Sequence, residues 1–356
     1  MPSAQLPSVR PLAAALVLLA AAVAVTGCGG SGSDPGAETG QIEVVATTTQ
    51  IGDWVSEVGG EAVSVHQILQ PNTDPHEFEP KPSDVQAAAS AQLVFANGDD
   101  LDHWIEQLVS DSGSDAEVVD LGAVVPVRLA GEGEHEHGDE RDEEHGDERD
   151  EEHGDERDEE HGDEHDEEHG GDSALDPHWW HDPTNAAAAI EEIAAKLIAA
   201  DPAAAERFEA DAAGYLAELE AMDEEIAACI ESVPSAQRKL VTDHDAFGYF
   251  ANRYGIEVVG AVIPAQTTQG QPSAKDLGEL AEEIEHEGVR AVFPESSVSS
   301  SVAAAIARQT GASAEYVLYG DTLGPAGSGA ATYIEMEKAN ADAMVRGFTG
   351  DERGCG

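Results

Sequence analysis

The sequence predicts an α/β fold with two lobes, each built on a mostly parallel sheet flanked by helices and joined by one long rigid helix. Two observations predict the lobes. The first is that short apolar runs alternate with helical patterns over residues 41–200, as parallel strands connected by helices do. The second is that the same alternation returns over residues 234–356. The third observation is an unbroken helical pattern over residues 201–233. A helix of about 30 residues spans roughly 45 Å, which is long enough to connect two lobes.

The first lobe opens with a strand in which Ile42, Val44 and Val45 lead into three threonines. The alternation continues through helix 51–58, strand 63–69, a helix from its predicted cap Ser83 to Ala91, strand 93–96, a helix around Trp104, strand 118–121 and helix 186–199. Pro71, Pro75 and Pro80 stiffen the loop after the second strand, because proline fixes its own φ and holds the preceding residue extended.

The long helix is predicted to start at Asp201-Pro202, a capping residue followed by proline at the first helical position. Its apolar residues are spaced to form one stripe: Phe208, Leu216, Leu219, Met222, Ile226 and Ile230. The second lobe repeats the alternation through strand 239–242, helix 246–254, strand 257–263, helix 273–287, strand 291–293, helix 302–309, strand 315–319 and helix 332–347.

The N-terminus predicts an exported lipoprotein. Arg10 precedes an apolar run that ends at Val25 and is short for a membrane span. The following Thr26-Gly27-Cys28 resembles a bacterial lipobox with Cys28 as the lipidation site. We therefore expect residues 1–28 to be a lipoprotein signal peptide and residues 29–40 a flexible tether, with the protein anchored on the extracytoplasmic face of the cell membrane. The alternative is an ordinary signal peptide with an incidental cysteine.

Only Cys229 and Cys355 remain after Cys28. In an exported protein a disulfide can persist, and it would tie the C-terminus to the middle of the chain. Two unpaired thiols are the open alternative.

The formal net charge of −56 excludes a general nucleic-acid binder, because phosphate contacts need clustered Lys and Arg. Residues 131–172 hold 24 acids and three arginines, in an eight-residue repeat that starts with histidine. A repeat this polar cannot offset its ordering entropy by burial, so we expect a disordered loop within the first lobe. Its histidines predict auxiliary weak metal sites, with a solubilising spacer as the alternative: His135, His137, His145, His153, His161, His165 and His169.

Three other histidines stand in constrained settings: His76 and His178 each follow an Asp-Pro pair, and His244 lies between two aspartates. Imidazole is a common metal ligand, and neighbouring carboxylates can orient its ring. In α/β sheets ligands bind beyond the C-terminal ends of strands, where His244 and Asp321 fall. The pattern predicts one shared metal site. Three histidines and a carboxylate fill a tetrahedral Zn²⁺ shell and leave no position for a catalytic water, which favours a carrier over a metallohydrolase.

Four segments, 72–80, 176–183, 244–250 and 319–324, resemble in this order the signatures of the metal-binding solute receptors of ABC transporters, of the ZnuA/TroA type. Pro294-Glu295-Ser296-Ser297 is similar too, and the resemblance covers residues 41–348 apart from the acidic tract. It implies a metal site in the cleft between the lobes, with His76 and His178 from the first lobe and His244 and Asp321 from the second.

The resemblance also implies roles for other residues. Glu295 fits the family pattern as a structural or orienting group rather than a ligand. His181 stands where the family usually has an aliphatic residue, and we expect it to be exposed, with a spare donor near the cleft mouth as the alternative. We expect the isolated histidines to be ordinary surface or core residues: His66, His103 and His286.

The function that the resemblance implies is an extracytoplasmic zinc receptor, monomeric, that delivers its cargo to a membrane permease and its cytoplasmic ATPase. Three nitrogens and one carboxylate favour Zn²⁺ over Mn²⁺, which prefers oxygen-rich shells. A His-rich loop is also typical of the zinc receptors. A receptor for manganese or another divalent metal is the alternative, a metallohydrolase is the alternative from another class, and the anchor is compatible with an added adhesin role.

Overall fold

The computed structural model describes residues 40–131, 175–351 and 353–355. The predicted signal peptide with Cys28, most of the tether and the acidic tract with its seven histidines lie outside the described residues. Among the helices that the structure describes, none combines the length and apolar character needed to cross a membrane.

The first half of the described chain is built on a four-stranded parallel sheet, as predicted. Its strands are β1 (Ile42–Ala46), β2 (Val63–Gln67), β3 (Leu93–Ala96) and β4 (Glu117–Asp120), in the order β2-β1-β3-β4. Successive strand residues point to opposite faces. Val44 accordingly packs in one core and Val45 in another, so both faces of the sheet are covered.

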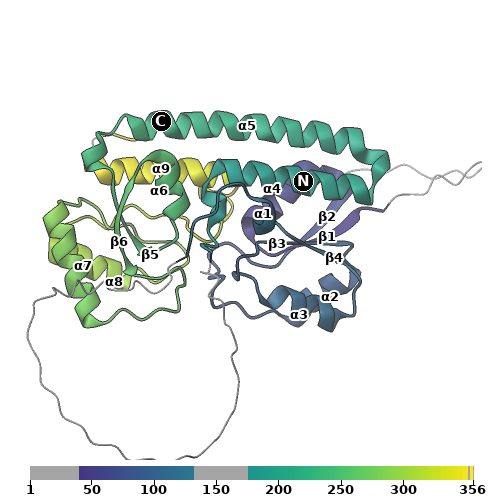
Figure 1. Ribbon diagram of the computed structural model, residues 1–356, viewed down its shortest axis with the longest axis horizontal. Helices are drawn as coiled ribbons and strands as arrows, with labels where there is room; N and C mark the ends of the chain where they lie inside the picture. The colour runs from purple at the N-terminus through teal and green to yellow at the C-terminus, as the bar shows by residue number, and fades with distance from the viewer. Residues whose placement is uncertain (1–39, 132–174, 352, 356) are drawn as a thin grey trace, which may run out of the picture. The chain divides into compact units, whose positions relative to one another are not determined.

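Four helices cover this sheet. Figure 1 shows α1 (Thr49–Gly59) and α4 (Pro183–Ala200) on one face, with α2 (Pro82–Ser90) and α3 (Trp104–Ser112) on the other. Proline starts two of them, because the first helical position needs no N–H donor. The predicted cap Ser83 is therefore wrong, since it lies inside α2, which begins at Pro82 with Lys81 as its N-cap. Helix α4 likewise begins at Pro183, three residues before the prediction, and the Asp182 side chain accepts from Thr184 N.

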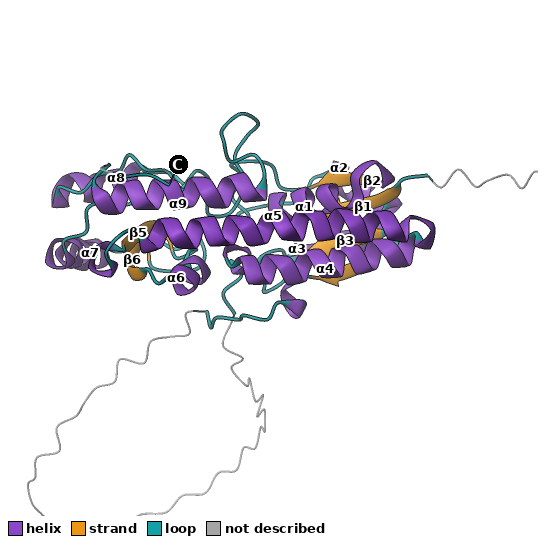
Figure 2. Ribbon diagram, turned by 90° about the horizontal axis from the view of Figure 1, so that it is seen from above, coloured by secondary structure: helices purple, strands orange, loops and turns teal. Residues whose placement is uncertain are grey.

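The long helix α5 (Ala205–Glu231) follows a short 3-10 turn that Asp201 caps by accepting from Ala203 N. Five of the six residues in the predicted stripe are buried, while Leu216 is only partly covered. Helix α5 packs on α1, α4 and α9 (Tyr333–Thr349), and Figures 1 and 2 show it running along both halves of the described chain. Because its 27 residues span about 40 Å, one element contacts both halves.

The second half pairs β5 (Lys239–His244) with β6 (Glu257–Ile263) in parallel and adds α6 (Gly248–Tyr254), α7 (Ala274–Glu287) and α8 (Ser301–Thr310). The predicted strands 291–293 and 315–319 are not regular strands. They pair at single residues, with parallel bridges from Phe293 to Thr242 and from Glu295 to Leu318. Pro294 stands between the bridged residues and has no N–H to donate, which interrupts a ladder.

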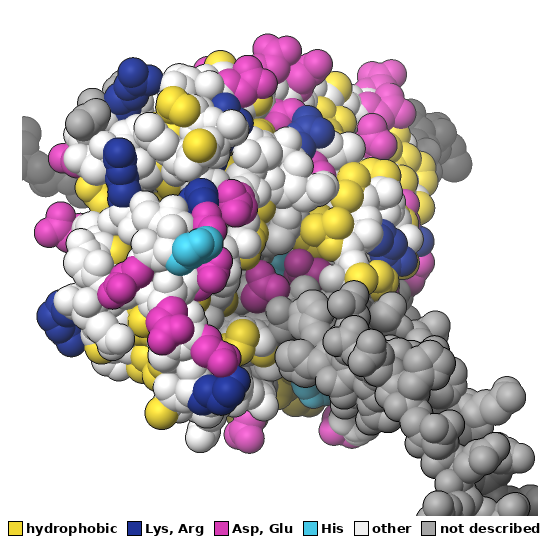
Figure 3. Space-filling view, turned by 60° about the vertical axis from the view of Figure 1, so that its left-hand side comes forward, with side chains coloured by type: hydrophobic (Ala, Val, Ile, Leu, Met, Phe, Trp, Pro, Cys, Tyr) yellow, Lys and Arg dark blue, Asp and Glu magenta, His cyan; other side chains and the backbone are white. Residues whose placement is uncertain are grey.

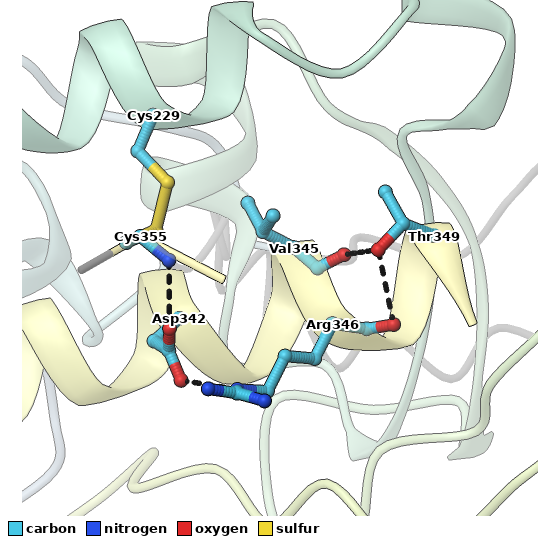
Figure 4. The surroundings of a disulfide bond; sticks show 6 residues. All are labelled: Cys229, Asp342, Val345, Arg346, Thr349 and Cys355. Carbon is cyan, nitrogen blue, oxygen red and sulfur yellow. Dashed lines mark hydrogen bonds and ion pairs between the residues drawn. A yellow bond between two sulfur atoms is a disulfide. The ribbon is translucent and has the colours of Figure 1, made fainter. Parts of the chain in front are cut away.

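Cys229 and Cys355 form a disulfide, which resolves the alternative that the sequence left open. Figure 4 shows the bond joining α5 to the C-terminal tail beside α9. Cys355 N donates to Asp342 Oδ1 at 2.7 Å, and Arg346 Nε donates to Asp342 Oδ2 at 2.7 Å. The tail is therefore fixed to both helices.

Negative charge is not confined to the acidic tract. On the face drawn in Figure 3, Asp and Glu side chains lie over many parts of the described surface, with Lys and Arg between them. This distribution agrees with the spread of acidic residues along the rest of the sequence.

Candidate metal centre

The structure brings the four predicted ligands together. One ligand atom from each of His76, His178, His244 and Asp321 lies within 4.8 Å of the other three. Asp321 Oδ1 is 3.7 Å from His76 Nε2, 3.6 Å from His178 Nε2 and 3.3 Å from His244 Nε2. Three imidazole nitrogens thus converge on one carboxylate oxygen.

Each ligand comes from a different segment. His76 lies in the proline-rich loop after β2, and His178 immediately precedes the 3-10 helix Trp179–His181. His244 is the last residue of β5 rather than the loop beyond it, and Asp321 follows the segment that bridges to Glu295. His178, His244 and Asp321 are fully buried, whereas the His76 side chain is 7% exposed. The centre therefore meets solvent on the His76 side.

Carboxylates orient two of the three rings. Asp176 Oδ1 accepts from His178 Nδ1 at 2.8 Å, and Glu295 Oε1 accepts from His244 Nδ1 at 3.0 Å. Because Nδ1 must carry the proton in each contact, Nε2 presents its lone pair to the centre. Glu295 therefore lies where the resemblance implied, beside a predicted ligand and outside the ligand set.

Two buried atoms at the centre, His76 Nε2 and Asp321 Oδ1, have no hydrogen-bond partner within the described part of the chain. Buried polar atoms are normally paired, and an exception points to an ion or a water. His76 Nε2 and Asp321 Oδ1 lie close to each other and to the Nε2 atoms of His178 and His244, and such a group of acceptors can bind a cation. The donor set therefore fits a divalent metal.

The protonation of the metal-free centre follows from its charges. Burial by itself lowers the pKa of His178, but the hydrogen bond to Asp176 and the nearby carboxylate of Asp321 outweigh it and raise the pKa to about 9. Burial also lowers the pKa of His244, but Glu295 and Asp321 raise it well above its ordinary value. Burial raises the pKa of Asp321, yet the nearby imidazoles of His244 and His178 hold it well below the usual range. Protons therefore occupy the position that a cation would take.

The loop that carries Asp321 is held by residues that the sequence analysis did not single out. Gln50 Nε2 donates to Asp321 O at 3.0 Å, and Leu323 N donates to Thr49 Oγ1 at 2.8 Å. Thr49 and Gln50 are both about 1% exposed. The available signal was a polar Thr-Thr-Thr-Gln run at the end of a buried strand, where polar side chains need partners.

The prediction that His181 is exposed is wrong, because the side chain is fully buried. Its Nδ1 lies 2.8 Å from Glu337 Oε1, its Nε2 lies 3.0 Å from Gly320 O, and its ring stacks on Phe247 with 4.5 Å between centroids. It is no spare donor either, since both ring nitrogens have partners. His103 and His286 are exposed and the half-buried His66 pairs with Asp84, which agrees with the expectation that these are ordinary surface or core residues.

An open cavity of about 470 Å³ lies beside His76, with Asp99, Asp100 and His103 on its wall. The loop after β6 reaches across to the His76 loop, where Thr268 Oγ1 donates to Asp74 Oδ2 at 2.6 Å and Gln269 Nε2 donates to His76 O. The wall carries the carboxylates of Asp99 and Asp100, and Asp99 is paired with Arg128 at 2.8 Å.

Comparison with known proteins agrees with this geometry. The family model of the zinc-uptake complex component A, periplasmic (ZnuA), matches residues 44–347. The manganese-binding lipoprotein MntA of Halalkalibacterium halodurans is 28% identical over 333 residues, covering 94% of this chain and 97% of the relative. The zinc-binding protein AdcA of Streptococcus pyogenes is 29% identical over 277 residues, covering 77% of this chain and 50% of the relative.

Among solved structures, the periplasmic zinc-binding protein TroA from Treponema pallidum is similar with a TM-score of 0.71 and 25% sequence identity. The match covers 87% of this chain and 99% of that chain. The two-lobed α/β architecture predicted from the sequence is therefore confirmed.

Proposed function

The chain belongs to the family of the zinc-uptake complex component A, periplasmic, and we propose on this basis that it captures Zn²⁺ outside the cytoplasm and passes it to the permease of an ABC importer. The family consists of substrate-binding receptors of ABC transporters and not of enzymes. The metal is therefore cargo, and the protein's task is to hold it selectively and release it.

One observation carries the assignment of the site. Three imidazole nitrogens and one carboxylate oxygen, from four separate segments, lie within 4.8 Å of one another in a buried pocket. Zn²⁺ takes four N, O or S ligands in a tetrahedron, so His76, His178, His244 and Asp321 would complete its shell. A complete protein shell suits carriage, because no position remains for a water to be activated.

Zinc is the proposed cargo because the third histidine, His244, adds a third nitrogen ligand to the centre. With His244 in the shell, the centre offers one oxygen ligand, whereas Mn²⁺ prefers oxygen-rich surroundings. Manganese is the second candidate, since a relative that is 28% identical over nearly its whole length is named as manganese-binding. The two candidates use the same residues and differ only in selectivity.

The partners and location follow from the same proposal. An ABC importer supplies a permease and a cytoplasmic ATPase, and lipidation at Cys28 would keep the receptor beside them on the extracytoplasmic face. Support comes from the lipobox-like sequence and from relatives named as lipoproteins. A Cys28→Ala variant should lose the lipid and leave the membrane fraction, and retention in that fraction would remove the anchor from the account.

Native mass spectrometry of protein purified without added metal tests the cargo. We expect one tightly held ion per chain, and we expect Zn²⁺ to displace Mn²⁺ when both are supplied equally. Preference for Mn²⁺ would make the protein a manganese receptor. Failure to retain any divalent ion would overturn the metal-receptor assignment.

A further inference from the structure

A second buried polar group lies next to the metal centre and is not part of it. The His181 side chain is fully buried and Glu337 of α9 is 1% exposed, with 2.8 Å between His181 Nδ1 and Glu337 Oε1. On the other side of the ring, His181 Nε2 lies 3.0 Å from Gly320 O. The imidazole therefore bridges α9 and the residue that directly precedes Asp321.

The contact with Gly320 defines the role of one ring nitrogen of His181. A carbonyl oxygen accepts hydrogen bonds, so Nε2 carries a hydrogen and donates to Gly320 O. The other nitrogen, Nδ1, shares a hydrogen bond with Glu337 Oε1, and this contact holds the ring in the orientation that Nε2 needs.

The Gly320 peptide has little freedom to move. Its carbonyl also accepts from Trp180 Nε1 at 3.1 Å, so neighbouring residues of one 3-10 helix fill both of its acceptor positions. An added Cβ at Gly320 would lie 2.3 Å from Glu295 Oε2 and 3.5 Å from Phe247. Glycine therefore lets this part of the backbone lie close to the carboxylate that orients His244.

Asp321 is the next residue, and its Oδ1 must point at three imidazole nitrogens. A shift of the Gly320 carbonyl would turn the peptide that carries this carboxylate. Metal sites lose affinity when the groups that orient a ligand are removed, typically about 10–100-fold. Asp176 and Glu295 act in this way on two histidines, through their side chains. His181 is placed to act on the fourth ligand through the backbone.

We propose that His181 is a positioning residue for the metal centre, which fixes the Gly320 carbonyl and thereby the aim of the Asp321 carboxylate. Glu337 holds the His181 ring in place for this task. The inference rests on the proposed metal-receptor function and assigns to it a residue beyond the four ligands. A pair that merely fills the core would affect stability alone.

The test compares three forms of the full-length protein. His181→Leu removes both ring nitrogens but leaves the Glu337 carboxyl group buried without a partner, which by itself destabilises a fold. The double variant His181→Leu/Glu337→Met replaces both polar side chains with apolar ones of similar size, and so separates lost positioning from a buried polar group without a partner. The matched control is His66→Leu, because His66 also pairs with a carboxylate, Asp84, at 3.1 Å and lies outside the centre.

Three readouts apply to each form: thermal unfolding without metal, Zn²⁺ affinity by chelator competition, and the visible absorption of bound Co²⁺, which reports ligand geometry. We expect both His181 variants to bind Zn²⁺ about 10–100-fold more weakly and to alter the Co²⁺ spectrum, with the double variant recovering stability but not affinity. The control should keep the affinity and the spectrum of the unaltered protein.

The inference is overturned if a folded double variant binds Zn²⁺ within about twofold of the unaltered protein with an unchanged Co²⁺ spectrum. If the unaltered protein itself binds neither ion at one per chain, the proposed function fails instead. The two failures are therefore distinguishable.

Discussion

The metal centre and the end of α7 both bring metal-ligating side chains close together. The two groups differ in burial and in the number of chain segments that supply them. At the end of α7, Glu283, His286 and Glu287 also place their ligand atoms within 4.8 Å of one another. These three belong to one helix, two of them are exposed, and Glu287 already pairs with Lys239. The four residues of the metal centre come from separate segments and are largely buried.

This difference shows what makes a site. At the end of α7, water solvates the carboxylates, so a cation gains little by replacing it. At the metal centre the ligands have lost their water, and carboxylates hold the rings of His178 and His244 with Nε2 toward one point. Desolvation and orientation, rather than the number of nearby donors, distinguish the two groups.

The largest expected effect comes from removing a ligand. His178→Ala should weaken Zn²⁺ binding by more than about 100-fold, because loss of a direct ligand exceeds the loss from an orienting partner. Competition with a zinc chelator measures this. A matched His103→Ala change, at an exposed histidine of the cavity wall, should leave the affinity within a few-fold. Near-native affinity of His178→Ala would remove His178 from the shell.

The next effect is the pH dependence of binding. Zinc must displace the protons of the metal-free centre, where the pKa of His178 is about 9 and that of His244 is also raised. Apparent affinity should therefore keep rising from pH 6 to about pH 9, instead of levelling off just above the ordinary histidine value of 6.5. Chelator competition across this range checks it, and a flat profile from pH 7 upward would contradict the raised pKa values.

The same raised pKa values predict that the stability of the metal-free protein falls as pH rises, whereas the affinity for zinc increases. A pKa raised on folding stabilises the fold fully below the unfolded value of 6.5, and this contribution is lost as pH rises through about 9. The depressed pKa of Asp321 acts the other way, and its contribution is lost only in acid. Thermal unfolding without metal should thus show stability from these histidines falling between pH 6.5 and 9.

An orienting partner should matter less than a ligand. Glu295→Gln keeps an oxygen for His244 Nδ1 but removes the charge, and we expect Zn²⁺ affinity to fall about 10–100-fold. Isothermal titration with a competing chelator gives the value. Asp84→Asn is the matched control, since it changes the carboxylate of a histidine pair outside the centre. Equal effects from both changes would mean that Glu295 has no special role.

The prediction for the acidic tract extends the comparison, because its histidines stand in a polar repeat without apolar residues. Deleting residues 133–170 should leave the tight site intact and remove only weaker Zn²⁺ binding. The sequence predicts weak binding there, because a repeat this polar cannot offset by burial the entropy cost of ordering its ligands. Calorimetry of both forms with Zn²⁺ decides. Loss of the tight site would mean that the tract supplies primary ligands.

The smallest effect should come from the end of α7. His286→Ala should leave the tight Zn²⁺ affinity unchanged, because the exposed cluster holds no oriented, desolvated ligand set. The same chelator competition measures it. A loss approaching that of His178→Ala would reverse the comparison.

The sequence predicted what local chemistry determines. The limits of β3 and β6 follow from apolar runs, and His76 and His178 stood out because proline fixes the backbone before them. The sequence did not predict contacts between residues that lie far apart along the chain. Glu337 lies 156 residues from His181, so no local pattern could show that this histidine is buried and paired. Thr49 and Gln50 were missed for the same reason, since the loop they hold is more than 270 residues away.

The most direct test of the account is a crystal structure of the zinc-loaded protein with anomalous diffraction measured at the zinc edge. We predict one strong peak about 2.0–2.2 Å from Nε2 of His76, His178 and His244 and from a carboxylate oxygen of Asp321. A strongest peak beside Glu283, His286 and Glu287, or at the centre without one of these four residues, would contradict it.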